Sequence, residues 1–184
     1  DGTWKSWGSN PSYYVQSIIE TVAGDPPETP SGQYPYIEDG DVALSESGAI
    51  VQYLLERYGN GQLEPPIGSK DRAAYLYWLH FAEGTAANAI NTTVWLTVYR
   101  DDADRHQEII SAVRDSANTV FNKIEAALAT QPYITGNDFS AADIMMGFTL
   151  GSAKWLQLLT DAHPKTLEYV DRLFARPALQ KSLS

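Results

Sequence analysis

Apolar residues in the second half of the chain recur at intervals of three and four, as they do along one face of an α-helix. Such stripes predict a helix over residues 109–128 and another over 167–174, which ends before Pro177. A further long helix is expected to start at its cap, Ser69, and to run towards Arg100. No strand pattern interrupts these segments, so they predict an all-helical domain.

The start of one more helix is marked by Ser140 and Asp143, which stand three residues apart as in a capping box. In such a box each side chain accepts a backbone N–H bond, and losing either costs about 0.5 to 2 kcal/mol. The helix then carries Ile144, Phe148 and Leu156 as its apolar residues. We interpret Ser140 and Asp143 as structural residues.

A hairpin and a helix are predicted in the first third of the chain. Asp39-Gly40 is a strong turn signal, so residues 34–38 and 41–44 should form two antiparallel strands. Apolar residues then recur at helical spacing over 46–58, before a glycine that stops the helix. This region therefore mixes strand and helix.

Glycines and prolines gather between the mixed region and the helical region, and such residues mark loops. We place a linker at residues 61–68, an α+β domain at 1–60 and an all-α domain at 69–184. A chain of 184 residues with 43% hydrophobic content is long enough to bury a core in this arrangement.

The strand and helix of the first domain predict a site for a small anionic ligand. Tyr34-Pro35 is an X-Pro step at a strand edge, where an extended peptide could pair with the backbone. At the helix start, free amides and the Ser47 hydroxyl would hold a carboxylate, and Glu46 could accept from an ammonium group. The alternative is a loop proline followed by a serine that only caps the helix.

The run YPYIEDGDVALSESGAIVQYLLERYG, with its X-Pro step, Asp-Gly turn and Glu-Ser helix start, resembles the glutathione-binding half of the cytosolic glutathione transferases. The run YLYWLHFAEG is similar to a fungal and bacterial branch of that family. The capping-box run GNDFSAADI also recurs in the family's helical domain. The resemblance thus extends over both predicted domains.

The resemblance assigns roles to particular residues. Tyr34, before Pro35, would pair its backbone with the cysteinyl unit of glutathione, and Glu46 and Ser47 would hold the γ-glutamyl end. Gln33 would lie beside the glycyl carboxylate. Glutathione would then be a co-substrate.

The fold implied by the resemblance is an N-terminal thioredoxin-like domain followed by an all-helical domain, in a homodimer. The implied reaction is attack of an activated glutathione thiolate on a hydrophobic electrophile, as in detoxification. Two alternatives use the same scaffold. One is a non-catalytic binding or regulatory module, and the other is a biosynthetic isomerase or cyclase.

In the resembled family, the loop before the first helix carries the residue that activates the glutathione thiol. Here the helix begins at Asn10-Pro11, and the candidates are Ser9 first, then Ser12, Ser6 and Asn10. A serine hydroxyl that donates to the thiolate, together with the helix dipole, would lower the pKa of the thiol from about 8.5 towards neutrality. The alternative is that Ser9 or Ser12 only caps the helix.

The chain departs from the family between Gly24 and Ser31, where only six residues stand. The family has a second strand there and usually a further helix. Either residues are missing from this sequence, or the thioredoxin-like domain is a reduced version with an altered site.

Composition narrows the function classes further. A formal charge of −10 and a pI of about 4.6 argue against nucleic acid as a partner. The absence of cysteine excludes a thiolate metal site and a protein thiol in catalysis, and we expect no metal. His80 and Glu83, three apart, fit a hydrogen-bonded interior pair better than a ligand pair.

The chain has no apolar stretch of about 18 residues that would span a membrane, and its start lacks the pattern of a signal segment. We therefore expect a cytoplasmic protein with no membrane partner.

Overall fold

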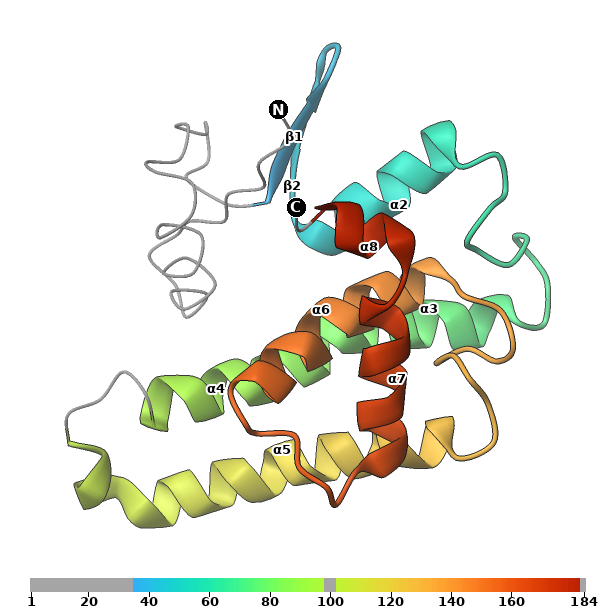
Figure 1. Ribbon diagram of the computed structural model, residues 1–184. Coiled ribbons are helices and arrows are strands. Elements are labelled where there is room, and N and C mark those ends of the chain that lie inside the picture. Colours follow the sequence, from blue (N-terminus) through green and yellow to red (C-terminus); the bar gives the residue numbers. More distant parts are fainter. Residues whose placement is uncertain (1–34, 98–101, 183–184) are drawn as a thin grey trace. The chain divides into compact units, whose positions relative to one another are not determined.

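The computed structural model describes residues 35–97 and 102–182, and the chain divides into two compact units at residues 1–60 and 61–184 (Figure 1). The elements are β1 (Tyr36–Asp39), β2 (Val42–Ser45), α2 (Ser47–Tyr58), α3 (Arg72–Phe81), the π-helical segment η1 (Ala82–Ala87), α4 (Asn88–Thr97), the 3-10 helix η2 (Ala103–His106), α5 (Gln107–Leu128), α6 (Ala141–Trp155), α7 (Pro164–Phe174) and α8 (Pro177–Ser182).

The predicted hairpin of the first unit is confirmed, with its turn one residue later than expected. β1 and β2 pair antiparallel, from Tyr36 opposite Ser45 to Asp39 opposite Val42. The turn residues are therefore Gly40 and the aspartate after it, and not Asp39 and Gly40. Gly40 has a φ of +63° at the first central position of the turn, a conformation that glycine adopts without strain.

Helix α2 follows the hairpin directly, as predicted, and ends with Gly59 as its C-cap. Its amide donates to the carbonyl of Leu55 at 2.8 Å. Helix α2 contacts both strands of the hairpin. Among the described residues of this unit, Ile50 alone is buried.

The helical unit begins with residues 61–68, which are held against the helices by specific bonds. The Leu63 carbonyl accepts from the amide of Ala141, the first residue of α6, at 2.8 Å. The guanidinium of Arg72 donates to the Glu64 carboxylate at 2.6 Å and to the Pro65 carbonyl at 2.8 Å. The side chains of Arg72 and Glu64 are each 13% exposed, so this ion pair is largely shielded from solvent.

The helix predicted from Ser69 towards Arg100 is present as far as residue 97, where this described range ends, but it starts later than predicted and includes a π-helical segment. Helix α3 begins at Arg72 with Asp71 at the N-cap, so the prediction that Ser69 caps the helix is wrong. The Ser69 carbonyl instead accepts from the Arg72 amide in the preceding turn, at 3.2 Å. The π-helical segment η1 then joins α3 to α4 and buries Ala82 and Ala86.

The core of the helical unit lies between the long helices. α3 contacts α6, α4 contacts α5, and α7 contacts both α5 and α6. The predicted apolar stripe of α5 is confirmed over most of its length, although Ile109 at its start is 54% exposed. The largest fully buried side chains are Tyr75, Leu79, Ile90, Phe121, Ile124, Ile134, Met146, Leu150 and Tyr169.

Helix α6 buries a different face from the one that the apolar pattern predicts. Ile144 is 43% exposed and Phe148 is 59% exposed. The buried face carries Met146 and Leu150, and glycines stand where α7 approaches α6 closely. A Cβ atom added to Gly147 would lie 2.8 Å from the Leu173 side chain, and one added to Gly151 would lie 2.6 Å from the ring of Phe174. These glycines permit the contact between the helices.

The predicted capping box at the start of α6 is confirmed, and the buried carboxylate of Asp143 does more than complete it. One of its oxygens accepts from the Ser140 amide at 2.8 Å and from the Ser140 hydroxyl at 3.0 Å. The other oxygen accepts from the Ile134 amide at 2.8 Å and from the Tyr169 hydroxyl at 2.7 Å. Asp143 therefore joins the loop before α6, α6 itself and α7.

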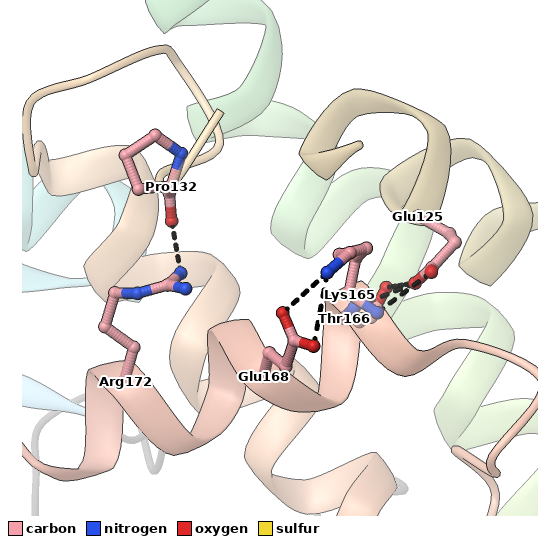
Figure 2. A network of polar contacts seen from close by, with 6 residues as sticks. All are labelled: Glu125, Pro132, Lys165, Thr166, Glu168 and Arg172. Atoms are coloured by element: carbon pink, nitrogen blue, oxygen red, sulfur yellow. Dashed lines mark hydrogen bonds and ion pairs between the residues drawn. The ribbon is translucent and has the colours of Figure 1, made fainter. Parts of the chain in front are cut away.

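A second carboxylate joins α5 to the start of α7, as Figure 2 shows. Glu125 accepts from the Lys165 amide at 2.9 Å, and from the amide and hydroxyl of Thr166 at 2.8 and 2.7 Å. Burial raises the pKa of Glu125, but the hydrogen bonds outweigh it and leave the pKa below its ordinary value. Along α7, Arg172 donates to the Pro132 carbonyl at 2.6 Å.

Among the described residues, no helix has the length and apolar character needed to cross a membrane.

We expect Asp143→Ala to destabilise the helical unit by about 3 kcal/mol or more, because it leaves buried N–H and O–H donors without acceptors. Urea denaturation followed by circular dichroism measures this change. Asp138→Ala, at an exposed position in the same loop, is the matched control and should stay within about 0.5 kcal/mol of the wild type. Equal stability of the two variants would contradict the role given to Asp143.

The stability of the chain should fall above about pH 10, and Tyr169 should contribute to the fall. Burial, then the charge and the hydrogen bond of Asp143, raise the pKa of Tyr169 well above its ordinary value. The unfolded chain releases this proton at lower pH than the folded chain, so the contribution is lost as pH rises from about 10 through the folded pKa. Tyr169→Phe should show a shallower decline in urea titrations at alkaline pH, and an unchanged slope would exclude this contribution.

Candidate functional site

The start of α2 presents backbone donors that the helix itself does not use. The first helical bond runs from the Ile50 amide to the Glu46 carbonyl, at 2.9 Å. The amides of Ser47, Gly48 and Ala49 therefore precede the hydrogen-bond ladder of the helix. With the positive end of the helix dipole, they form a place where an anionic group is stabilised.

Glu46 enters this helix through an unusual backbone conformation. Its φ is 76° and its ψ is 112°, which a residue other than glycine adopts at a cost of about 1 to 3 kcal/mol. Its side chain is exposed and makes no capping bond to α2. The strained backbone directs the chain from β2 into the helix and leaves the carboxylate available to a cationic group.

The side-chain positions at the start of α2 are open. Ser47 and Gly48 are only partly buried, and a Cβ atom added to Gly48 would meet nothing within 4 Å. The donor set, the serine hydroxyl and the nearby carboxylate fit the carboxylate and ammonium groups of an amino acid.

The hairpin register brings a third predicted residue to the same end of the unit. Tyr36 pairs with Ser45, so the preceding Pro35 and the following Glu46 both stand at the open end of the hairpin. Pro35 is partly buried. The structure thus gathers Pro35, Glu46 and Ser47, which are separated by up to 12 positions in the sequence.

The other predicted site residues fall outside the described part of the chain. These are the ligand residues Gln33 and Tyr34, and the candidates for thiol activation Ser9, Ser12, Ser6 and Asn10. The short segment between Gly24 and Ser31 lies there too.

A polar cluster at the other end of the hairpin was not predicted. The Asp39 carboxylate accepts from the Tyr53 hydroxyl at 2.7 Å and from the Tyr58 hydroxyl at 2.5 Å. The Nε atom of Arg57 lies 3.1 Å from the same carboxylate oxygen. Asp39 stands at the tip of the hairpin, and its three partners stand on the C-terminal half of α2.

The pKa values of the cluster reflect these bonds. Hydrogen bonds from Tyr58 and then Tyr53 lower the pKa of Asp39, and the bond to Asp39 raises the pKa of Tyr53. The pKa of Arg57 is raised by its bond to the Tyr58 hydroxyl and by the charge of Asp39. All three partners meet the same oxygen of the carboxylate. The sequence shows Arg57 one turn after Tyr53, but nothing in it indicates that Asp39 is their partner.

His80 and Glu83 do not form the interior pair that the sequence predicted, because both are exposed. Within the described ranges, no group of three or more histidine, cysteine, aspartate or glutamate side chains is arranged to hold a metal ion.

Two family models match the chain. The model of the glutathione S-transferase N-terminal domain matches residues 16–66, and that of the C-terminal domain matches residues 107–172. Together they span well over half of the sequence. The first includes the whole hairpin and α2, and the second includes α5, Asp143 and most of α7.

Individual relatives of the chain are also named as glutathione S-transferases or as similar to them. Glutathione S-transferase GstB of Escherichia coli is 28% identical over 154 residues, which are 83% of this chain and 74% of the relative. The glutathione S-transferase-like protein tpcF of Aspergillus fumigatus is 27% identical over 180 residues, covering 84% of this chain and 75% of the relative.

A solved structure agrees in fold. A sphingomonad glutathione S-transferase complexed with glutathione has a TM-score of 0.69 and 27% identity, covering 84% of this chain and 74% of that one. The predicted fold is confirmed: a thioredoxin-like N-terminal domain, whose described residues include a short two-stranded sheet, and a helical C-terminal domain. The chain belongs to the glutathione S-transferase family.

Proposed function

We propose that this chain binds glutathione at the start of α2 and joins the glutathione thiolate to a hydrophobic electrophile. The observation that carries the proposal is the free backbone amides of Ser47, Gly48 and Ala49 at the start of α2. The strained backbone of Glu46 leads the chain into this helix start. An anionic ligand that also carries an ammonium group is the natural occupant of this arrangement.

Glutathione would occupy the site along its whole length. Its γ-glutamyl carboxylate would accept from the helix-start amides and the Ser47 hydroxyl, while its ammonium group would donate to Glu46. Its cysteinyl backbone would pair with Tyr34, before Pro35, and Gln33 would contact the glycyl carboxylate. The sphingomonad relative that is solved with glutathione supports this choice of ligand.

The reaction needs a thiolate, which a hydroxyl from the N-terminal loop would stabilise. Ser9 is our first candidate, and Ser12, Ser6 and Asn10 are the alternatives. The thiol proton leaves to solvent, the sulfur forms a bond to the electrophilic carbon, and the leaving group departs with the electron pair of its own bond. Positioning of the thiolate and the lowering of its pKa would supply most of the rate enhancement.

The oligomeric state, location and biological role are proposed by analogy with the family. We propose a homodimer, a cytoplasmic location and a detoxifying role towards apolar electrophiles. The name of the relative from Escherichia coli supports transferase activity.

A second candidate function is a non-catalytic module, or a biosynthetic isomerase or cyclase, on the same scaffold. The relative from Aspergillus fumigatus is named only as glutathione S-transferase-like, and this name supports the second candidate function. Both the first candidate and an isomerase that uses glutathione require the ligand to bind, whereas a bare scaffold does not.

Ser47→Ala should raise the Kd for glutathione about tenfold or more, because it removes a hydroxyl that donates to a charged carboxylate. Isothermal titration of glutathione into the purified chain measures this directly. Ser116→Ala, at an exposed position on α5, is the control and should leave the Kd unchanged. A wild-type chain that is folded and does not bind glutathione would overturn the proposal.

Ser9→Ala should raise the pKa of the bound glutathione thiol by about 1 to 2 units, because about 1.4 kcal/mol of thiolate stabilisation corresponds to each unit. Ultraviolet absorbance of the thiolate against pH gives this pKa, and the rate with 1-chloro-2,4-dinitrobenzene should fall in parallel. Ser12→Ala should change neither quantity. If the Ser12 variant loses the thiolate and the Ser9 variant keeps it, the two assignments are reversed.

A further inference from the structure

The β1–β2 hairpin is joined to α2 at two points, one at each end. At the open end, Ser45 leads through Glu46 into the helix, and this link is covalent. At the tip, Asp39 is bonded to Tyr53 and Tyr58 on the helix. The four-residue strands separate the two points by about 10 Å, at roughly 3.3 Å per residue.

The covalent link alone leaves the angle between hairpin and helix weakly defined. Glu46 has a φ of 76°, a conformation that costs free energy and persists only where its surroundings impose it. Rotation at this residue would swing the whole hairpin relative to the helix start. Pro35 would then move away from the amides of Ser47 and the residues that follow it.

Apolar packing between the described residues of this unit provides limited resistance to such a rotation. Ile50 is the one buried side chain among them, and Leu54 and Tyr58 on the same helix are 37% and 54% exposed. Among the described residues, the polar cluster at the tip therefore acts where buried apolar side chains are few, and it acts at the greatest distance from the hinge.

The cluster is built to hold one geometry. Its three donors converge on a single carboxylate oxygen of Asp39, and Arg57 also bonds the Tyr58 hydroxyl at 3.0 Å. The guanidinium lies over the rings of Tyr53 and Tyr58, 5.8 and 5.6 Å from their centres. The contacts span 14 to 19 residues of sequence, so they fix the tip of the hairpin to the far half of α2.

We propose that Asp39 is a positioning residue of the glutathione site, and that it acts through Tyr53 and Tyr58. By fixing the hairpin tip to α2, it holds Pro35 at the distance from the Ser47 helix start that one glutathione molecule spans. Asp39 touches no ligand. This role rests on the proposed function, because it concerns the same site.

The test is a double-mutant cycle in the full chain with glutathione as the probe. Asp39→Ala and Tyr53→Phe should each raise the Kd for glutathione about threefold to tenfold, as expected for residues that act on a site indirectly. The Kd of the double variant should be no higher than that of the single variant that binds glutathione more weakly, because both substitutions break the same contact. Isothermal titration gives the Kd values, and urea denaturation gives the stability of each variant.

Glu38→Gln is the matched control, because it removes one carboxylate from the same strand. Glu38 is exposed, and its carboxylate accepts from the Tyr36 hydroxyl on the same strand of the hairpin. Its Kd should stay within about twofold of the wild type. Tyr53→Phe keeps the aromatic ring and the backbone, so it tests the proposal even if Asp39→Ala does not fold.

The outcomes separate this proposal from the one on which it rests. If the wild type does not bind glutathione, the proposed function fails. If the wild type binds and the Tyr53→Phe variant binds equally well, Asp39 has no positioning role. A variant that loses stability while its folded fraction keeps the wild-type Kd shows a purely structural contact, which also overturns the proposal. Weaker binding in both single variants, with non-additivity, supports it.

Discussion

The helical unit depends on one buried carboxylate. Asp143 is fully buried and accepts from two backbone amides and two hydroxyl groups. A buried charge is tolerated only when its hydrogen bonds are satisfied, so the loop before α6, the first turn of α6 and α7 must all be in place together. Glycines at 147 and 151 then allow α7 to approach α6 closely. The core between these helices is built around that constraint.

In the mixed unit, a carboxylate near the surface also joins separate elements. Among its described residues Ile50 alone is buried, and the Asp39 carboxylate is bonded by two tyrosine hydroxyls and a guanidinium. Such an exposed cluster adds little to the free energy of unfolding, because solvent screens its charges. It can still select one orientation of a short hairpin, since competing orientations would lose several directional bonds at once. Specific geometry, more than overall stability, is what a ligand site requires.

The candidate site draws its chemistry from the backbone. The amides at the start of α2 are free because the helical ladder begins only at Ile50, and the conformation of Glu46 aims the chain so that Ser47 stands at the helix start. In the proposed function, side chains would add selectivity to this anion site, with a carboxylate for the ammonium group and a hydroxyl for the carboxylate. Membership of the glutathione S-transferase family and the local geometry therefore point to the same kind of ligand.

The sequence by itself determined the hairpin, the helix that follows it, the capping box and the long helices, because these depend on local signals: turn glycines, caps and helical periodicity. It also indicated Glu46 and Ser47, since a Glu-Ser helix start after a hairpin is a local pattern. Only the tertiary structure decided which face of α6 is buried, because Gly147 and Gly151 matter through the side chains of α7. It alone joined Asp39 to Tyr53 and Asp143 to Tyr169, because a hydrogen bond between residues distant in sequence leaves no periodic trace in either segment.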